Sequence, residues 1–370
     1  MSTTNWFCVA FVACFAGACG GHSGQPTTTQ EGAGPGGTST PPQIYGVWHC
    51  GDDACTWSSM RDIADFDQKN HWLIDRGDGM PSVNLVILSF VNPLKLLNRT
   101  SDAETQNGVP IGMTADIVRY FESRGVRVML SIGGITYTND WDAALAADGA
   151  QLGLNAAAVA SELGVGIEID YENSSNPNLA ALQAFVDAYR SRLSYDPSGA
   201  NHAARLTIDL AAGTRWLVEL TAKASRDWLD TEHPVLDYAN AMVSGRNQPD
   251  ASVSQTQWLE HVDGDPRMTP PIVPLAPAKF TGSLWLHGDS IECAIYSGSV
   301  TEELAPFVQT VAPAPGVGTS PGLLGFMFWA AECEGTKTTC TTPPNSCEGG
   351  VGQGGKALNV PFAMPPLRQR

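Results

Sequence analysis

A stretch of seven residues, Gly166–Glu172, reads GIEIDYE and decides the fold. Successive side chains of a strand point to opposite faces, so Glu168, Asp170 and Glu172 share one face and the apolar residues share the other. Carboxylates in a protein interior are costly unless they are hydrogen-bonded or partly protonated, so a chain that keeps three of them is expected to use them. Two other interpretations of the three carboxylates are a solvent-exposed acidic edge strand and a binding site for Mg²⁺ or Ca²⁺. The metal site would need further ligands from other strands.

Seven more short apolar runs lie before and after this stretch in the sequence. Several of the segments between them show helical periodicity, most clearly Leu179–Leu193, which follows Asn176 and Pro177. Near-continuous apolarity is typical of parallel strands that are buried on both faces. Eight alternating units predict an α/β fold, a single (β/α)8 TIM barrel, with a doubly wound sheet as the alternative. The seventh run is the weakest, because Pro270–Pro277 before it is too rich in proline for a regular helix. The eight runs are Ile44–His49, Val83–Val91, Val126–Gly133, Val165–Glu172, Arg205–Ala212, Leu236–Val243, Gly282–His287 and Leu323–Trp329.

The N-terminus is typical of an export signal that ends near residue 19. Trp6–Ala18 is apolar but too short to span a bilayer comfortably, although Met1–Asn5 lacks the usual Lys or Arg. The small residues before Cys19 are similar to the lipobox of bacterial lipoproteins, in which that cysteine is acylated. We therefore expect an exported protein, either secreted or held at a membrane only through a lipid on Cys19.

The remaining boundaries follow from composition. Residues 20–43 are rich in Gly, Ser, Thr and Pro and have little to bury, so they are expected to form a disordered linker. The barrel would then occupy residues 44–335, and residues 336–370 would be a Cys-, Gly- and Pro-rich tail. Lys and Arg number 21 against 38 Asp and Glu, and the resulting net charge of −17 argues against nucleic acid as a partner. A monomer is expected.

Three of the nine cysteines lie in residues 1–19, and the other six are an even number, as an oxidised exported domain requires. None of them has the Cys-x-x-Cys spacing of a structural zinc site, so disulfides are favoured over a metal. Short loops favour pairing Cys50 with Cys55 and Cys340 with Cys347, which leaves Cys293 with Cys333, although sequence alone leaves the pairing open.

Three motifs together resemble glycoside hydrolase family 18, the chitinases and endo-β-N-acetylglucosaminidases. Ser131–Gly134 matches the family's third-strand Ser-x-Gly-Gly signature, and Val165–Glu172 aligns with its fourth-strand Asp-Gly-x-Asp-x-Asp-x-Glu. Gly325–Trp329 is similar to the eighth strand, whose tryptophan forms the floor of the sugar pocket. The three occur in the family's order and at barrel spacing, so the resemblance covers most of Ile44–Glu334.

The resemblance implies a retaining, substrate-assisted glycosidase that hydrolyses β-1,4 linkages in N-acetylglucosamine-containing glycans, in chitin or in the core of N-glycans. The nucleophile would be the N-acetyl oxygen of the substrate. Glu172 would be the general acid and base, Asp170 would orient the N-acetyl group, and Glu168 would share a proton or a hydrogen bond behind it. No metal or organic cofactor is implied, and the partner would be an oligo- or polysaccharide.

Substrate contacts are expected from residues at the strand ends, because sugar rings stack on aromatic side chains in open clefts. They are Trp329, Ser131, Gly133, Gly134, Met242, Ser244, Tyr137 and Trp48, with Trp216 as a further aromatic candidate. For Tyr137, Trp48 and Trp216, ordinary core packing is the alternative.

Several positions depart from the family pattern. Val165 replaces the first aspartate of the fourth-strand motif, and Ser244 and Gly245 stand where the sixth strand usually has tyrosine and aspartate. A catalytically inactive barrel that binds N-acetylglucosamine sugars is therefore the alternative function. In the fifth run, Asp209 stands where the family usually has a small residue, and it is either a fourth interior acid or a satisfied structural aspartate.

Overall fold

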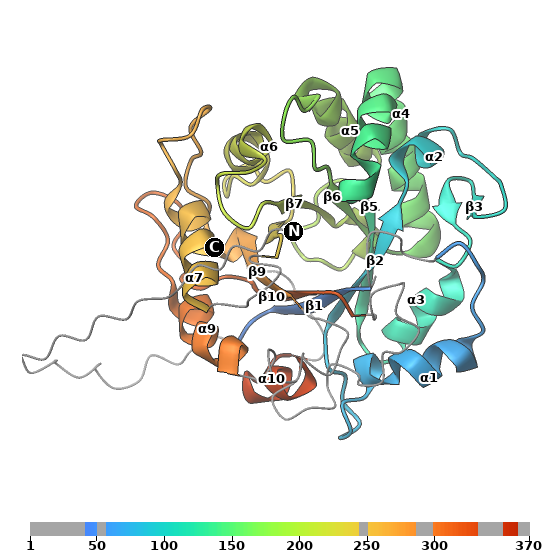
Figure 1. The fold of residues 1–370 in the computed structure, drawn as a ribbon, viewed down its shortest axis with the longest axis horizontal. Coiled ribbons are helices and arrows are strands. Elements are labelled where there is room, and N and C mark those ends of the chain that lie inside the picture. Colours follow the sequence, from blue (N-terminus) through green and yellow to red (C-terminus); the bar gives the residue numbers. More distant parts are fainter. Residues whose placement is uncertain (1–40, 50–56, 244–250, 286–298, 332–350, 362–370) are drawn as a thin grey trace, which may run out of the picture. The chain divides into compact units, whose positions relative to one another are not determined.

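The structure is a computed structural model that describes residues 41–49, 57–243, 251–285, 299–331 and 351–361. All of these lie in one compact unit, Ser39–Arg370. Eight parallel strands close into a barrel in the order β1-β10-β9-β8-β7-β6-β5-β2 (Figure 1). They are β1 (Ile44–His49), β2 (Leu85–Val91), β5 (Arg127–Gly133), β6 (Gly166–Asp170), β7 (Leu206–Leu210), β8 (Ala239–Ala241), β9 (Phe280–Trp285) and β10 (Gly325–Trp329).

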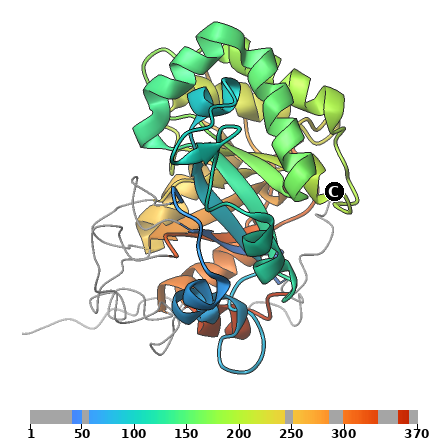
Figure 2. The same ribbon diagram turned by 90° about the vertical axis from the view of Figure 1, so that its right-hand side faces the viewer.

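The expected (β/α)8 barrel is confirmed, and the open doubly wound sheet is wrong, because β1 pairs with both β2 and β10 and closes the sheet. Helices surround the barrel, and a two-stranded ribbon, β3 (Thr105–Gln106) and β4 (Val109–Pro110), lies outside it (Figures 1 and 2). The helices are α1 (Ile63–Ile74), α2 (Pro93–Leu97), α3 (Ala115–Glu122), α4 (Thr138–Leu163), α5 (Leu179–Arg192), α6 (Val218–Lys223), α7 (Ala251–Asp263), α9 (Ser299–Thr310) and α10 (Val351–Ala357).

The structure moves several of the expected element boundaries. The sixth strand is the most shortened, since β8 covers only Ala239–Ala241 of the expected Leu236–Val243. The fourth strand ends at Asp170, so Glu172 lies two residues beyond it. The seventh strand begins two residues earlier than expected, at Phe280, and the proline-rich segment before it holds only a short 3₁₀ turn, Pro277–Lys279. Helix α5 begins at Leu179, as expected, ends at Arg192 and is capped by Asn178, whose side chain accepts a hydrogen bond from the Ala181 backbone.

Two separate apolar clusters stabilise the barrel. The larger one packs the outward-facing strand residues, such as Val86, Leu130 and Ile167, against the helices. The smaller one lies within the barrel and consists of Ile44, Trp48, Leu85, Ile87, Met129, Tyr238, Leu324 and Met327, with Trp329 against it. This inner cluster accounts for why strands that are buried on both faces read as continuous apolar runs.

Above the inner cluster the barrel interior becomes polar. Ser131 lies two residues beyond Met129 on β5, and Asn240, on β8, lies two residues beyond Tyr238. Both are fully buried. Because all eight strands are parallel, these positions lie toward the carboxyl ends of the strands, where barrel sites are built.

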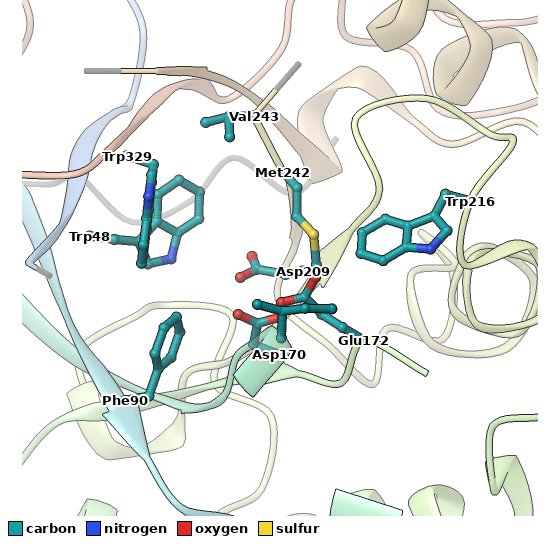
Figure 3. Close-up of a pocket in the computed structure, with 10 residues that line it drawn as sticks. Trp48, Phe90, Asp170, Glu172, Asp209, Trp216, Met242, Val243 and Trp329 are labelled. Carbon is teal, nitrogen blue, oxygen red and sulfur yellow. The ribbon is translucent and has the colours of Figure 1, made fainter. Parts of the chain in front are cut away.

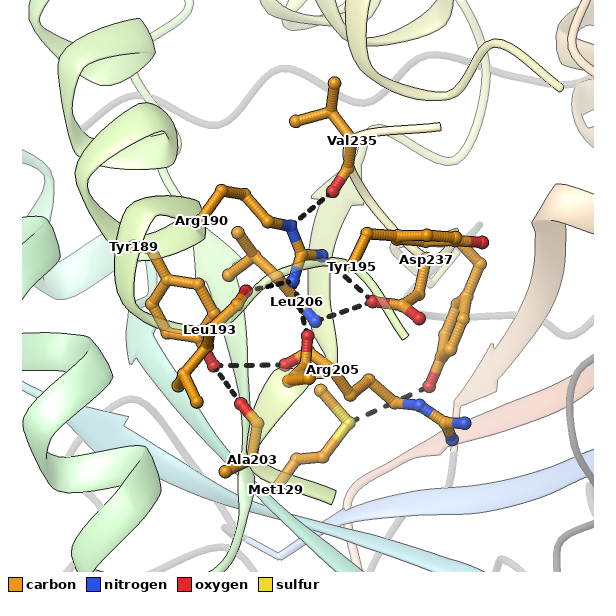
Figure 4. A network of polar contacts seen from close by, with 12 residues as sticks. Met129, Tyr189, Arg190, Leu193, Tyr195, Ala203, Arg205, Leu206, Val235 and Asp237 are labelled. Carbon is orange, nitrogen blue, oxygen red and sulfur yellow. Dashed lines mark hydrogen bonds and ion pairs between the residues drawn. The ribbon is translucent and has the colours of Figure 1, made fainter. Parts of the chain in front are cut away.

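An ion pair anchors the opposite end of the barrel (Figure 4). Arg190, on α5, lies 3.1 Å from Asp237 and also donates to the Val235 carbonyl at 2.6 Å. The Asp237 carboxylate in turn accepts the backbone N–H of Leu206 at 2.8 Å. Helix α5 and the starts of β7 and β8 are thereby held in register, which places the side chains at the far ends of both strands.

No helix in the described ranges is long and apolar enough to cross a membrane. The residues that bear on export, lipidation and disulfide bonding lie outside the described ranges, so those expectations stay predictions. They are Cys19, Cys50, Cys55, Cys293, Cys333, Cys340 and Cys347.

A hydrogen bond from His261 connects α7 to the barrel wall, and the burial of this histidine predicts that stability depends on pH. It is 1% exposed, its Nε2 lies 2.9 Å from the Ala211 carbonyl, and burial lowers its pKa to about 4. A histidine with a lowered folded-state pKa stabilises the fold above its unfolded pKa of about 6.5, and this contribution is lost as the pH falls toward 4. The two pKa values correspond to a loss of about 3 kcal/mol over that window.

We therefore expect His261→Gln, which keeps an N–H donor, to lose less unfolding free energy than the wild type between pH 6.5 and 4. Urea unfolding at several pH values measures this difference. His233→Gln is the matched control, because the His233 side chain is 88% exposed and its replacement should leave the pH dependence unchanged. Equal pH dependence in the wild type and His261→Gln would contradict the assignment.

Candidate active site

A cavity of about 310 Å³ opens at the carboxyl ends of the strands (Figure 3). Aromatic and acidic side chains dominate its lining, which includes Trp48, Phe90, Trp216, Trp329, Asp170, Glu172, Asp209 and Met242. Of the residues expected from the sequence to contact substrate, Trp329, Trp48, Met242 and the further candidate Trp216 line this cavity. A site at this end is what a barrel of parallel strands favours, because its loops and strand ends converge there.

Trp48, Phe90 and Trp329 form a wall on one side of the cavity, and Trp216 lies on the opposite side (Figure 3). The rings of Trp329 and Phe90 stack at 5.7 Å with 23° between their planes. Trp48 lies 6.3 Å from Trp329 with a tilt of 59°. Phe90 was missed by the sequence reasoning, because it lies near the end of a strand that reads as uniformly apolar.

The acids lie at graded depth. Glu168 is fully buried, Asp170 is 5% exposed, and Glu172, just beyond the end of β6, is partly exposed. Asp170 and Glu172 line the cavity, whereas Glu168 lies deeper in the barrel and does not. The alternation expected from the sequence therefore holds for Glu168 and Asp170, and Glu172 reaches the same cavity from the chain that follows the strand.

Glu168 is held by donors from two other strands. Its Oε1 accepts the indole N–H of Trp48 at 2.8 Å, and its Oε2 accepts the amide of Asn240 at 2.6 Å. The Asn240 amide is oriented because its oxygen accepts the Thr281 hydroxyl at 2.6 Å. Burial raises the pKa of Glu168, and the hydrogen bonds from Trp48 and Asn240 oppose that rise. Donors on both oxygens favour the ionised form of this carboxyl.

Asp209 also lies in the interior. It is 2% exposed, sits on β7 in register with Asn240, and lines the cavity. Burial, followed by the charges of Glu168 and Asp170, raises its pKa well above the usual aspartate value. The four acids thus come from two neighbouring strands and the segment just after one of them. Within the described ranges, no group of three or more His, Cys, Asp or Glu side chains is arranged to hold a metal ion.

The Ser-x-Gly-Gly segment shapes the site from below. Gly133 has φ of +119°, and a Cβ at that position would lie 1.9 Å from the Asp170 carbonyl oxygen. That same oxygen accepts the Gly134 backbone N–H at 3.0 Å and the Trp141 indole N–H at 2.9 Å. A residue without a side chain is therefore needed where the end of β5 supports the end of β6.

Other expected contact residues lie elsewhere. Ser131 is fully buried and pairs in register with Glu168, below the cavity. Gly133, Gly134 and Tyr137 are not among the cavity-lining residues, and the 3₁₀ turn Ile135–Tyr137 presents Ile135 to the cavity instead. Ser244 and Gly245 lie outside the described residues.

Replacing Gly133 by alanine should displace the carbonyl of Asp170. We expect Gly133→Ala to lower thermal stability and kcat together, because the new methyl group cannot coexist with the Asp170 oxygen in its present position. Gly164→Ala is the matched control: this glycine also has positive φ, +72°, but nothing lies within 4 Å of its added Cβ. The control should show only the left-handed backbone cost of about 1–2 kcal/mol and an unchanged kcat.

Unfolding midpoints and turnover numbers for both variants check this expectation. A Gly133→Ala protein with the stability and kcat of the Gly164→Ala protein would show that the close approach does not matter.

Comparison with known proteins gives likenesses of fold. No family model matches the sequence, and no curated protein matches it. The solved structures that this chain resembles include family 18 chitinases. One is the family 18 chitinase from Pseudoalteromonas aurantia, at 14% identity and a TM-score of 0.48, covering 78% of this chain and 93% of that one.

Two more solved structures show likeness of the same order. A chitinase from Bacillus thuringiensis has 12% identity and a TM-score of 0.48, covering 89% of this chain and 71% of that one. The Cycas revoluta family 18 chitinase in complex with (GlcNAc)3 has 13% identity and a TM-score of 0.41, covering 78% of this chain and 94% of that one.

Proposed function

We propose that this protein is a retaining, substrate-assisted glycosidase that cleaves β-1,4 linkages in N-acetylglucosamine-containing glycans such as chitin or the N-glycan core. The observation that carries the proposal is the cavity itself. A partly exposed Glu172 and a nearly buried Asp170 face a wall of Trp329, Phe90 and Trp48 across it (Figure 3). An apolar wall opposite convergent acids suits a sugar ring, whose apolar face stacks on aromatic side chains while its hydroxyl and amide groups meet polar ones.

Each acid has a task that suits its depth. Glu172 is the most exposed of them, and it would protonate the glycosidic oxygen as the bond to the leaving sugar breaks. The oxygen of the substrate's N-acetyl group would attack the anomeric carbon in the same step and form a cyclic oxazolinium ion. Glu172, now ionised, would then take a proton from the water that opens this ring, which retains the configuration.

Asp170 lies one strand position deeper and would accept a hydrogen bond from the N–H of the acetamido group. Its negative charge would also stabilise the positive charge that develops on that group, and such fixed electrostatic stabilisation is commonly the largest contribution to catalysis. Glu168 would stay below the substrate as part of the support for this layer, because its oxygens are occupied by Trp48 and Asn240.

The alternative is a catalytically inactive barrel that binds N-acetylglucosamine sugars. It is motivated by Val165, Ser244 and Gly245, which depart from the motifs of the family that the sequence resembles. Glu172 favours catalysis over this alternative, because a protein that only binds sugar has no need of a proton donor at the mouth of the cavity.

Export belongs to the same proposal, since chitin and glycoproteins are found outside the cytoplasm. The protein would be a secreted or lipid-anchored monomer with Cys19 at the mature N-terminus, and intact-mass measurement would show whether acyl chains are attached.

Glu172→Gln should abolish most of the activity while binding survives, because the amide cannot donate a proton to the leaving oxygen. We expect kcat on a chromogenic chitobiose or chitotriose glycoside to fall about 10²–10⁴-fold, the range typical of general acid–base catalysis. Binding of the trisaccharide, followed by calorimetry, should change little. Glu162→Gln, on the exposed surface of α4, is the control and should keep full activity.

The same assay separates the candidate functions. A wild-type protein that binds chitin oligomers and high-mannose glycopeptides but releases nothing from either would establish the binding protein. Loss of activity on adding a chelator would instead favour a metal-dependent hydrolase. Proton NMR of the first product formed distinguishes a retaining enzyme from an inverting one.

A further inference from the structure

Glu172 lies beyond the end of β6, so the strand ladder does not fix its position. The last residue of β6 in register with β5 is Asp170, and the last in register with β7 is Ile169. The next helix, α5, begins only at Leu179. A proton donor has to be held within hydrogen-bond reach of the leaving oxygen, and a misplacement of about 1 Å can cost roughly 10²-fold in rate. Contacts outside the ladder therefore have to position Glu172.

The carboxylate of Asp142, on α4, binds both neighbours of Glu172 in the chain. Its Oδ1 accepts the hydroxyl group of Tyr171. The side-chain amide of Asn173 donates to the same Oδ1 at 3.0 Å and to Oδ2 at 2.9 Å. One carboxylate thus holds the residue before Glu172 and the residue after it, and it connects both to the same helix.

Each of these two neighbours is itself fixed by the chain that follows. Tyr171 is fully buried, and its hydroxyl oxygen accepts the backbone N–H of Asn178 at 3.0 Å. The side-chain oxygen of Asn173 accepts the backbone N–H groups of Ser175 and Asn176 at 2.9 and 3.0 Å. These bonds determine which end of the Asn173 amide faces α4, because only its nitrogen can donate to a carboxylate.

The residue before Asp142 holds the end of the strand. Trp141 is fully buried, and its indole N–H donates to the Asp170 carbonyl at 2.9 Å. Its ring also lies 5.6 Å from the ring of Tyr171, with 44° between their planes. Two consecutive residues near the start of α4 therefore hold the chain on both sides of Glu172.

We propose that Asp142 is a positioning residue of the glycosidase: by binding the residues on both sides of Glu172, it keeps that carboxyl group where it can protonate the leaving oxygen. This role rests on the proposed function of Glu172. Asp142 is not among the residues that line the cavity, so it acts through its neighbours and not on the substrate. Its removal should therefore lower kcat without weakening sugar binding.

Exchanging the two side chains of the pair tests this role. Asp142→Asn alone sets one amide nitrogen against another, and Asn173→Asp alone sets two carboxylates together. Each single variant should lower kcat on the chitotriose glycoside about 10-fold, with KM within about twofold of the wild type. The double variant Asp142→Asn/Asn173→Asp again places a donor opposite an acceptor, and its kcat should return to within about threefold of the wild type.

Asp187→Asn is the matched control for the loss of the carboxylate. The Asp187 carboxylate also accepts a side-chain amide, that of Gln183 at 2.8 Å. Both residues lie on α5, and neither lines the cavity. This variant should keep the kcat of the wild type.

Dependence on the leaving group is a readout that a merely structural role would not change. A sugar needs a proton as it departs, whereas dinitrophenolate departs without one. For Asp142→Ala we expect kcat/KM to fall about 10²-fold on chitotriose but less than about fivefold on the dinitrophenyl glycoside of chitobiose. Glu172→Gln should show the same preference, because it lacks the same proton transfer.

Either of two results would overturn the inference. One is a double variant as slow as the two single variants, although all three are folded and bind the trisaccharide. The other is an Asp142→Ala enzyme that loses the same factor on both leaving groups, which would indicate a loss of folded protein and not of proton donation.

Hydrogen exchange followed by mass spectrometry separates this inference from the proposed function, because it needs no turnover. The backbone amides of Ser175, Asn176 and Asn178 are bonded within the network, so they should exchange about 10-fold faster in Asp142→Ala. Faster exchange together with a wild type that cleaves no N-acetylglucosamine glycoside would support the positioning by Asp142 and reject the function. Unchanged exchange together with full wild-type hydrolysis would reject the role of Asp142 alone.

Discussion

The buried carboxylate of Glu168 is the interaction on which the rest of the site depends. A negative charge at the centre of a barrel is stable only when hydrogen-bond donors surround it, and here they come from Trp48 on β1 and Asn240 on β8. Asn240 is oriented by Thr281 on β9. One acid therefore links four of the eight strands, and the polar layer that it requires separates the apolar interior below from the cavity above.

The polar layer around Glu168 also affects the acids that line the cavity above it. Asp170 and Asp209 lie at its upper edge, where solvent is nearly excluded and like charges act strongly on one another. Backbone packing also positions Asp170, because its carbonyl accepts the N–H groups of Gly134 and Trp141 and is closely approached by Gly133. The backbone of Asp170 is thus held by groups that do not line the cavity.

Much of the architecture could be predicted because its causes are local. Eight apolar runs separated by helical periodicity require parallel strands covered on both faces, and all eight are present. The ends of strands were less predictable. β6 ends at Asp170, whose carbonyl accepts the N–H groups of Gly134 and Trp141, and β9 starts at Phe280 after a 3₁₀ turn that no periodicity marks. Tyr137 was expected at the cavity, but the turn that contains it presents Ile135.

By itself the sequence determined that Glu168 and Asp170 share a face, because alternation along one strand is a property of the backbone alone. It also determined the barrel and the acidic character of one strand. Only the tertiary structure decided that Asp209 lines the same cavity as Asp170, that Phe90 stacks on Trp329, and that Glu172 lines this cavity from beyond the strand. The reason is that periodicity gives the face of a residue's own strand, whereas contacts across a barrel depend on the register and closure of all eight strands.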